Sequence, residues 1–212
     1  MGHCSYVVLQ CFHSTEMKYS LSEITNLIRH RRSVPPEQYS SRKVHREQIE
    51  LILTNATWAP THGMTQPWRY KVYMDDGLKK LGDFLPDLYK SKTAPEKFKE
   101  VKYDRLKTRL QNISAMIVIC MERDKSGKIA EIEEIEAVAC SVQNMMLTTV
   151  AYGLACYWSS PGYIYSEEMN KFLGLEKDDK CLGLFYIGYP SGDWPQSHRK
   201  PLEYVTEWIT QQ

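Results

Sequence analysis

The sequence predicts an α+β fold, because strand-like and helix-like segments alternate along 212 residues without an internal repeat. Segments 68–74 and 181–188 have the composition of strands, and 113–121 is a short apolar run rich in β-branched residues. Segment 129–152 instead repeats apolar residues at the spacing of a long amphipathic helix. The connections are too irregular for repeated βαβ units, which leaves α+β as the prediction.

Two helices are expected before the first strand. The first begins at a capping box formed by Ser20 and Glu23 and ends near the basic run 29–32. The second covers about 46–57 and has one apolar face. The strand at 68–74 follows and places alternate residues on one face.

The region after this strand has the weakest pattern. Following one short predicted helix, residues 90–109 are dense in lysine and have few apolar anchors, so we expect a mobile, solvated helical excursion. A buried strand at 113–121 and a long helix at 129–152 come next. Gly153 stands where a helix C′ glycine belongs, which supports the end of that helix.

Composition and charge exclude several classes of protein. A formal net charge of +1 gives no global basic surface for nucleic acid or an anionic membrane, and no apolar run approaches the roughly 18 residues of a membrane span. Six scattered cysteines without a CxxC pair favour reduced thiols and a cytoplasmic protein. Because residues 1–17 make a poor signal peptide, we expect an N-terminal extension there, which can be disordered, and a single domain at 18–212.

Common catalytic motifs are missing from the sequence. It has no GxGxxG after a strand, no GxxxxGK[ST], no HExxH and no GxSxG, which argues against Rossmann dehydrogenases, P-loop enzymes, zincins and α/β-hydrolases. The histidines never stand at i, i+4 with a carboxylate, so no metal site is expected. We assign no catalytic side chain and expect a bound organic cofactor to carry the chemistry of an enzyme.

Arg31, Arg32 and Ser33 form the first candidate binding group. Two guanidinium groups and a hydroxyl at the end of a helix can hold a phosphate through charge-assisted hydrogen bonds. The alternative is that these cations only complement the helix macrodipole. Near the C-terminus, Arg199 and Lys200 supply two more cations, or alternatively a solvated charge pair.

Two connecting segments provide the other candidates. The loop at 60–68 joins a helix to a strand, and its His62 and Gln66 can present hydrogen bonds to the edge of a planar heterocycle. A second segment closes on a Ser-Ser-Pro-Gly turn, where backbone amides and small hydroxyls are available: Trp158, Ser159 and Ser160. An ordinary helix-to-strand connection and an ordinary turn are the alternatives for these two segments.

Together these groups resemble the motifs of the FMN-dependent nitroreductase family, in the same order, over roughly residues 21–208. The matching elements are its RRS run, its AP…QPW loop, the turn after its long central helix, its iGyP strand end and its R-x-P-L element. The resemblance implies a central mixed β-sheet flanked by helices and an intimate homodimer. It also implies two FMN sites at the dimer interface, each with residues from both chains.

The resemblance assigns a set of residues to FMN, with the arginines at its phosphate and the loop and turn at its ring: Arg31, Arg32, Ser33, His62, Met64, Gln66, Trp158, Ser159, Ser160, Arg199 and Lys200. Two positions depart from the family pattern. Many relatives carry Lys or Arg where Pro35 stands, near the flavin N1/O2 edge, and Asn where Met64 stands. These departures leave the redox poise of the flavin open.

The implied activity is an NAD(P)H-dependent ping-pong reaction. NADH or NADPH delivers a hydride to flavin N5, and a nitroaromatic or quinone-like acceptor then takes two electrons. Residues 90–109 are the expected lid over the acceptor. The alternatives are a flavin-consuming or dehalogenating relative of the same fold, a non-catalytic flavin-binding sensor or storage protein, and a cofactor-free helical interaction module. Neither a nucleic acid nor a membrane is an expected partner.

Overall fold

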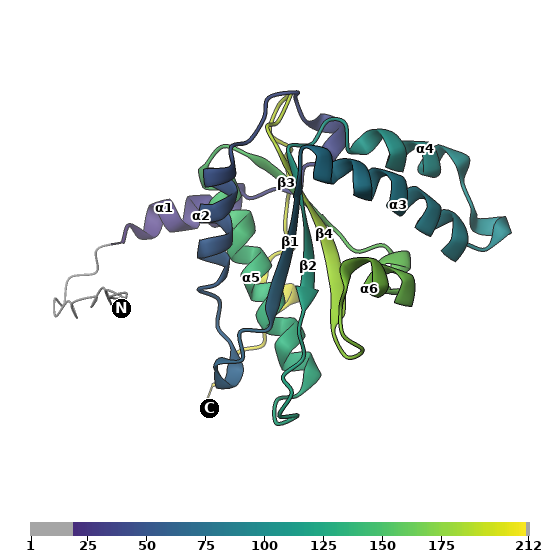
Figure 1. Ribbon diagram of the computed structural model, residues 1–212. Coiled ribbons are helices and arrows are strands. Elements are labelled where there is room, and N and C mark those ends of the chain that lie inside the picture. The colour runs from purple at the N-terminus through teal and green to yellow at the C-terminus, as the bar shows by residue number, and fades with distance from the viewer. Residues whose placement is uncertain (1–18, 211–212) are drawn as a thin grey trace, which may run out of the picture.

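The computed structural model describes residues 19–210, so the extension expected at 1–17 lies outside the described residues, and the single domain at 18–212 stays a prediction. At the centre is a four-stranded sheet with the order β1-β2-β4-β3 (Figure 1). Its strands are β1 (Trp68–Met74), β2 (Ala115–Met121), β3 (Ala155–Ser159) and β4 (Lys180–Gly188).

All three strand pairs of this sheet are antiparallel. The expected mixed sheet is therefore corrected for residues 19–210, although the α+β class itself is confirmed. The β1–β2 pair shows the reason. Between these strands, α3 (Asp76–Lys92) and α4 (Glu100–Arg109) form a hairpin that returns the chain to the end of the sheet where β1 finished (Figure 1).

Helices cover both faces of the sheet. On one face lie α1 (Leu21–His30), α2 (Arg46–Ala56) and α5 (Glu131–Ala151), and on the other lie α3, α4 and α6 (Glu167–Leu173) (Figure 1). Because both of its faces are covered, β2 is buried along its whole length. This burial explains the continuous apolar run and confirms the strand predicted within 113–121.

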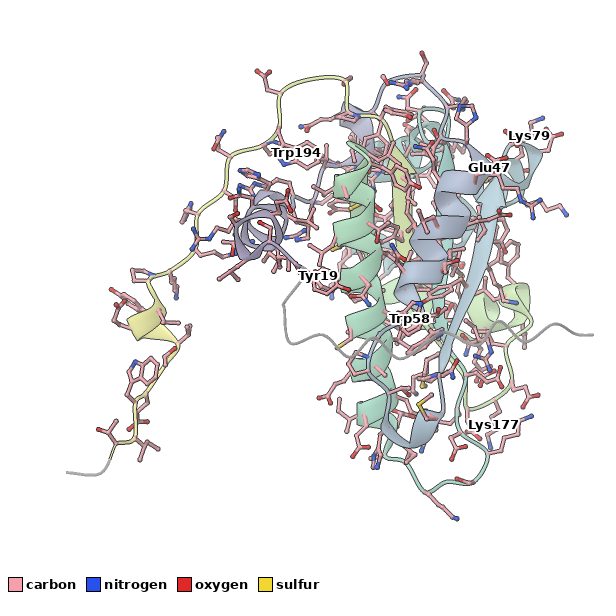
Figure 2. All side chains as sticks on the ribbon, turned by 90° about the vertical axis from the view of Figure 1, so that its left-hand side faces the viewer. Tyr19, Glu47, Trp58, Lys79, Lys177 and Trp194 are labelled. Carbon is pink, nitrogen blue, oxygen red and sulfur yellow. The ribbon has the colours of Figure 1, made fainter. Side chains whose placement is uncertain are left out.

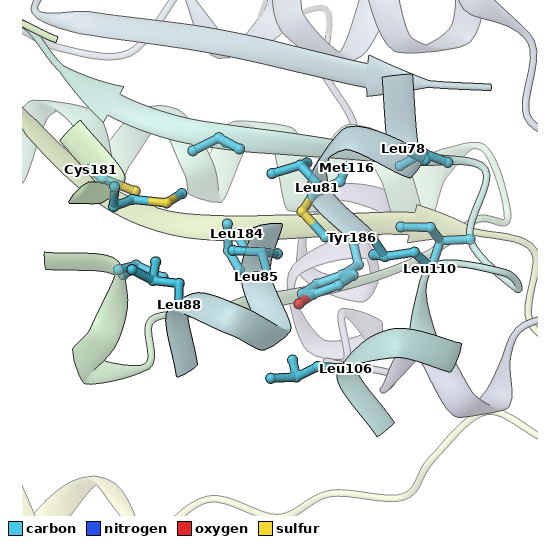
Figure 3. Close-up of a cluster of buried hydrophobic side chains, with 14 of the residues drawn as sticks. Leu78, Leu81, Leu85, Leu88, Leu106, Leu110, Met116, Cys181, Leu184 and Tyr186 are labelled. Atoms are coloured by element: carbon cyan, nitrogen blue, oxygen red, sulfur yellow. The ribbon is translucent and has the colours of Figure 1, made fainter. Parts of the chain in front are cut away.

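Each face of the sheet has its own apolar core. Alternation along β2 sends Ile117 toward α2 and α5, and Met116 toward α3 and α4. Figure 3 shows the second core, where Leu81 and Leu85 of α3 pack beside Tyr186 of β4. Burying an aliphatic side chain of this size contributes about 1.5–3 kcal/mol to folding. The sheet is thus held between two independent apolar layers.

The expectation for residues 90–109 is partly wrong. The region is helical and mostly exposed, as expected, but Leu106 within it is buried against α3, as is Leu110 directly after it. The hairpin is therefore anchored in the core rather than simply solvated. Its apolar residues are divided between two helices separated by a short 3-10 turn at Pro95–Lys97, so no single helical period runs through the sequence.

One side of the molecule keeps large apolar side chains on its surface. α1 buries none of its residues, and Leu21 and Ile28 are 77% and 52% exposed. Figure 2 shows α1 and the C-terminal segment projecting from this side, with Tyr19 and Trp58 at the surface. Within residues 19–210, no helix combines the length and the apolar character needed to cross a bilayer.

Candidate functional site

The first candidate group lies where α1 ends beside β3. The backbone N–H of Arg31 donates to Leu27 O over 3.2 Å and closes the helix. Three residues later, the backbone N–H of Val34 donates to Cys156 O of β3 over 2.9 Å. These two bonds hold Arg31, Arg32 and Ser33 between the end of a helix and the edge of the sheet.

The two guanidinium groups have different surroundings. Arg31 lies with Nη1 3.7 Å from the Met146 sulfur and has no carboxylate partner among residues 19–210. Arg32 donates from Nε to Pro195 O over 2.7 Å, and from Nη1 to Arg29 O over 2.6 Å. Arg31 thus keeps an uncompensated positive charge, whereas Arg32 ties the C-terminal segment to α1.

The end of β3 carries the second group. Trp158 is half-buried, and its indole N–H is the one buried side-chain donor of the described chain that lacks a hydrogen-bond partner. A buried donor without an acceptor is costly, so such an atom needs an explanation. Ser159 and the exposed Ser160 follow directly. Ser159 lies three residues beyond Cys156, which is about 10 Å along an extended strand.

Gly183 of β4 gives Trp158 the room that it occupies. A Cβ atom on Gly183 would lie 1.9 Å from Trp158 Nε1 and 2.6 Å from its Cδ1. Gly183 stands beside a β-bulge, where the β2–β4 register shifts between Ile119 and Cys120. The missing side chain of Gly183 therefore leaves the space that the indole occupies against β4.

The loop at 60–68 has an unusual backbone. Gly63, Met64 and Gln66 all have positive φ, at 57°, 54° and 46°. Two non-glycine residues in this region within one short loop indicate strain, which gathers at functional sites. The hydroxyl oxygen of Thr61 accepts the backbone N–H of Gln66 over 3.2 Å and supports the turn. Met64 is 72% exposed, so the loop offers its side chains to the outside.

This loop and the arginine group lie at opposite ends of α5. His62 bonds through Nδ1 to Glu133 near the start of α5, whereas Arg31 contacts Met146. Those two α5 residues are thirteen positions apart, which is about 20 Å along a helix. One chain therefore brings Arg31–Ser33 together with the end of β3, but does not bring His62, Met64 or Gln66 to them.

The C-terminal cations are also separate from the arginine group. Arg199 and Lys200 are exposed, and Nη1 of Arg199 donates to Ser197 Oγ over 2.7 Å and to His198 O over 2.8 Å. Both bonds are local, so within residues 19–210 no contact joins Arg199 to Arg31. Trp194 does reach α1, donating from Nε1 to His30 O over 2.6 Å. Nothing in the sequence indicated this contact between the C-terminal segment and α1, because Trp194 stands there as an isolated tryptophan.

The thiol beside this group is not a nucleophile. Burial raises the pKa of Cys156 to about 12, even though the nearby Arg31 guanidinium lowers it. The thiol is therefore protonated at neutral pH, and thiols in that state are poor nucleophiles.

A family model described as "Nitroreductase family" matches residues 28–189, which is most of the chain. The chain belongs to the nitroreductase family, as the motifs predicted. The Bacillus subtilis protein YfhC, provisionally named an NAD(P)H nitroreductase, is 24% identical over 188 residues, covering 89% of this chain and 95% of YfhC. An iodotyrosine deiodinase from Nematostella vectensis is 27% identical over 205 residues, covering 90% and 76% of the two chains.

Solved structures share the fold. A nitroreductase-like family protein from Bacillus cereus superposes with a TM-score of 0.75 at 28% identity, covering 92% of this chain and 99% of that one. The FMN-dependent nitroreductase NfnB from Mycobacterium smegmatis, solved in complex with NADPH, has a TM-score of 0.69 at 18% identity, covering 90% and 100%. The nitroreductase-like architecture is thereby confirmed.

Proposed function

We propose that this protein is an FMN-dependent oxidoreductase that uses NADH or NADPH to reduce a nitroaromatic or quinone-like acceptor. The observation that carries the proposal is that a cation without a carboxylate partner lies beside strand β3, which itself carries a buried donor without an acceptor. Arg31, in the turn after α1 that bonds to β3 through Val34, lacks a carboxylate, and Trp158 near the end of β3 lacks an acceptor for its buried N–H. Bound FMN would supply the hydride acceptor at N5 and the two-electron transfer to the substrate.

The chain's own residues fit the two ends of FMN. Arg31, Arg32 and Ser33 would hold the phosphate, because guanidinium groups and a hydroxyl suit a dianion. Trp158, Ser159 and Ser160 would lie at the ring, about 10 Å away along β3, a span that the ribityl chain can bridge. We also assign Arg199 and Lys200 to the phosphate as further cations.

We propose that two chains complete each site. An antiparallel pairing of two α5 helices across a two-fold axis would bring the 60–68 loop of one protomer to the arginine group of its partner. His62, Met64 and Gln66 would then act in the partner's site. The exposed apolar residues on this side of the molecule support a homodimer, and include Leu21, Ile24, Ile28, Trp58, Ile132 and Trp208.

A visible spectrum of the purified protein tests this function directly. We expect oxidised-flavin absorption, with released FMN identified by mass at about one per chain, and bleaching on anaerobic addition of NADH or NADPH. A quinone should then restore the absorption. Protein that stays colourless after incubation with excess FMN would overturn the proposal. Flavin that NAD(P)H does not bleach would favour the non-catalytic binding protein instead, to which the Pro35 and Met64 departures point.

Reductive dehalogenation is the second candidate, because the deiodinase from Nematostella vectensis shares 27% identity with this chain, over 76% of its own length. The two reactions share a reduced flavin but differ in their products. Release of iodide from iodotyrosine by the dithionite-reduced protein would support the second candidate. Reduction of nitro or quinone compounds without halide release would support the first.

A further inference from the structure

A cavity of about 550 Å³ opens between the end of the α3–α4 hairpin and the short 3-10 helix η4 (Gly162–Tyr165). The α3–α4 hairpin lies on the right of Figure 1. The charged lining of the cavity within the described chain consists of lysines alone. We call it the basic cavity, and its lining groups with chemistry are Lys92, Lys97, Lys99, Lys102, Tyr89 and Tyr163.

A neighbouring cavity of similar size has a different charge pattern. This mixed cavity, about 650 Å³, lies along the same hairpin nearer to β1 and is lined by three lysines and three aspartates: Lys43, Lys79, Lys107, Asp75, Asp83 and Asp87. Charges of both signs alternate on an ordinary protein surface, as they do there. The basic cavity has only positive side chains in its lining. This local excess of positive charge does not follow from the net charge of the chain, which is only +1.

Most of the positive charge in the basic cavity is uncompensated. Lys92 Nζ lies 2.6 Å from Glu168 Oε1, which neutralises one cation. Lys97, Lys99 and Lys102 form no ion pair with a carboxylate of residues 19–210. Lys102 Nζ lies instead over aromatic rings, 4.6 Å from the centroid of Tyr89 and 5.8 Å from that of Tyr163. A cation–π contact orients the ammonium group but leaves its charge available to an anion.

The two tyrosines make the cavity wall rigid. Tyr89 and Tyr163 are 3% and 8% exposed and pack edge to face with centroids 5.8 Å apart. The hydroxyl oxygen of Tyr89 accepts the backbone N–H of Lys99 over 3.0 Å, which fixes the rim that carries the lysines. Burial raises the pKa of Tyr163, so its hydroxyl stays a hydrogen-bond donor. Preorganised donors and cations of this kind suit an oxyanion.

The basic cavity lies close in the chain to Ser160, which we assign to the flavin ring. Gly162 lines the cavity and stands two residues after Ser160, so their Cα atoms are at most about 7.6 Å apart. We infer that the basic cavity is a subsite for the phosphate or carboxylate group of a small molecule that reacts at the flavin. This inference rests on the proposed function and names its substrate class: a reductant or acceptor that carries an oxyanion.

Matched triple variants of the FMN-loaded protein test the inference. The first is Lys97→Gln with Lys99→Gln and Lys102→Gln. The control is Lys43→Gln with Lys79→Gln and Lys107→Gln, which removes the same charge from the mixed cavity. Calorimetric binding of 2′,5′-ADP and of 4-nitrobenzoate is compared with that of the less charged or neutral analogues 5′-AMP and 4-nitrobenzamide.

We expect the first variant to lose about tenfold or more of its preference for an anionic probe over the matched analogue, since charge-assisted hydrogen bonds disappear. The control should change that preference less than twofold. If only the preference for 2′,5′-ADP over 5′-AMP is lost, the occupant is the 2′-phosphate of the reductant. If only the preference for 4-nitrobenzoate over 4-nitrobenzamide is lost, the occupant is the carboxylate of the acceptor. Equal changes in the two variants, or none, would overturn the inference.

A second measurement separates this inference from the proposed function. Replacing the same three lysines by arginine keeps the charge and should keep the preference within about threefold. Flavin bleaching by NADPH is followed in parallel. If no variant and no wild-type protein is bleached, the proposed function fails, while the calorimetric preference still decides whether the basic cavity binds oxyanions.

Discussion

The two helical layers of this protein differ in how completely one chain buries them. The layer of α3, α4 and α6 closes over its own core, and residues such as Leu81 and Leu85 are 0% and 2% exposed. In the layer of α1, α2 and α5, the inner faces of α2 and α5 are buried equally well, but Leu21 and Ile28 of α1 are in contact with solvent. Surface apolar residues of this number and size mark an interface. One layer is thus closed within the chain, and the other is the face on which we propose the dimer contact.

The same leucine-to-alanine change in the two layers gives the largest expected contrast. Leu81→Ala should lower the free energy of unfolding by about 2–5 kcal/mol, because a cavity forms in the closed core. Leu21→Ala should stay within about 0.5 kcal/mol at protein concentrations where the chain is monomeric. Urea unfolding followed by circular dichroism measures both. Equal losses would contradict the division into a closed and an open layer.

A charge placed on the open layer should act on association. Ile28→Asp is expected to weaken the dimer by about 2–4 kcal/mol, which is roughly thirtyfold or more in its dissociation constant, and to lower FMN content. Val101→Asp on α4 is the matched control, since Val101 is 81% exposed on the closed layer. Sedimentation velocity over a dilution series reports the dimer. A dimer unchanged by Ile28→Asp would place the interface elsewhere.

Gly183→Ala tests the fit between Trp158 and the sheet beneath the open layer. The added methyl group would meet the indole at 1.9 Å, so we expect a cost of about 1–3 kcal/mol and a displaced Trp158. Gly192→Ala, where nothing lies within 4 Å of the new Cβ, is the control. Thermal unfolding and FMN titration check the two effects. Unchanged FMN affinity with a displaced indole would remove Trp158 from the proposed site.

The smallest effect concerns the ion pair that ties α4 to the turn after α1. Partial burial raises the pKa of Glu37, but its hydrogen bonds with Arg109 lower it further, so the net pKa falls below its ordinary 4.5. A lowered pKa stabilises the folded state above the unfolded pKa, and the contribution disappears as the pH falls through the folded value. Because Glu37 is 40% exposed, we expect less than about 1 kcal/mol.

Glu37→Gln should therefore be less stable than the wild type at pH 7, and the two should converge as the pH falls through the lowered pKa of Glu37. Glu50→Gln, which breaks a more exposed i, i+4 pair with Arg46, is the control and should change stability by about 0.3–0.5 kcal/mol at most. Urea midpoints across this pH range provide the comparison. A Glu37→Gln deficit that persisted in acid would show that packing, and not charge, links α4 to the turn.

Local patterns in the sequence predicted much of the fold. The strand at 68–74 coincides with β1, and the helix expected at 129–152 contains α5. Both predictions are confirmed because an element buried on one face repeats its apolar residues at a regular spacing, and that spacing is visible in the local sequence. The α3–α4 hairpin was predicted less well, since the apolar residues that bury it belong to two helices with a break at Pro95–Lys97. β3 is an edge strand of five residues, too short to show a clear period.

The candidate site divides in the same way. The sequence alone determined the family, the identity of the cationic and aromatic candidates, and the need for a bound cofactor. It did not determine that Arg31 and His62 contact α5 at points about 20 Å apart, or that Lys97, Lys99 and Lys102 line one cavity with Tyr163. Those facts were decided by the tertiary structure alone. They depend on strand pairing and helix packing between residues that are distant in sequence, and a local hydrophobic pattern carries no information about such pairs.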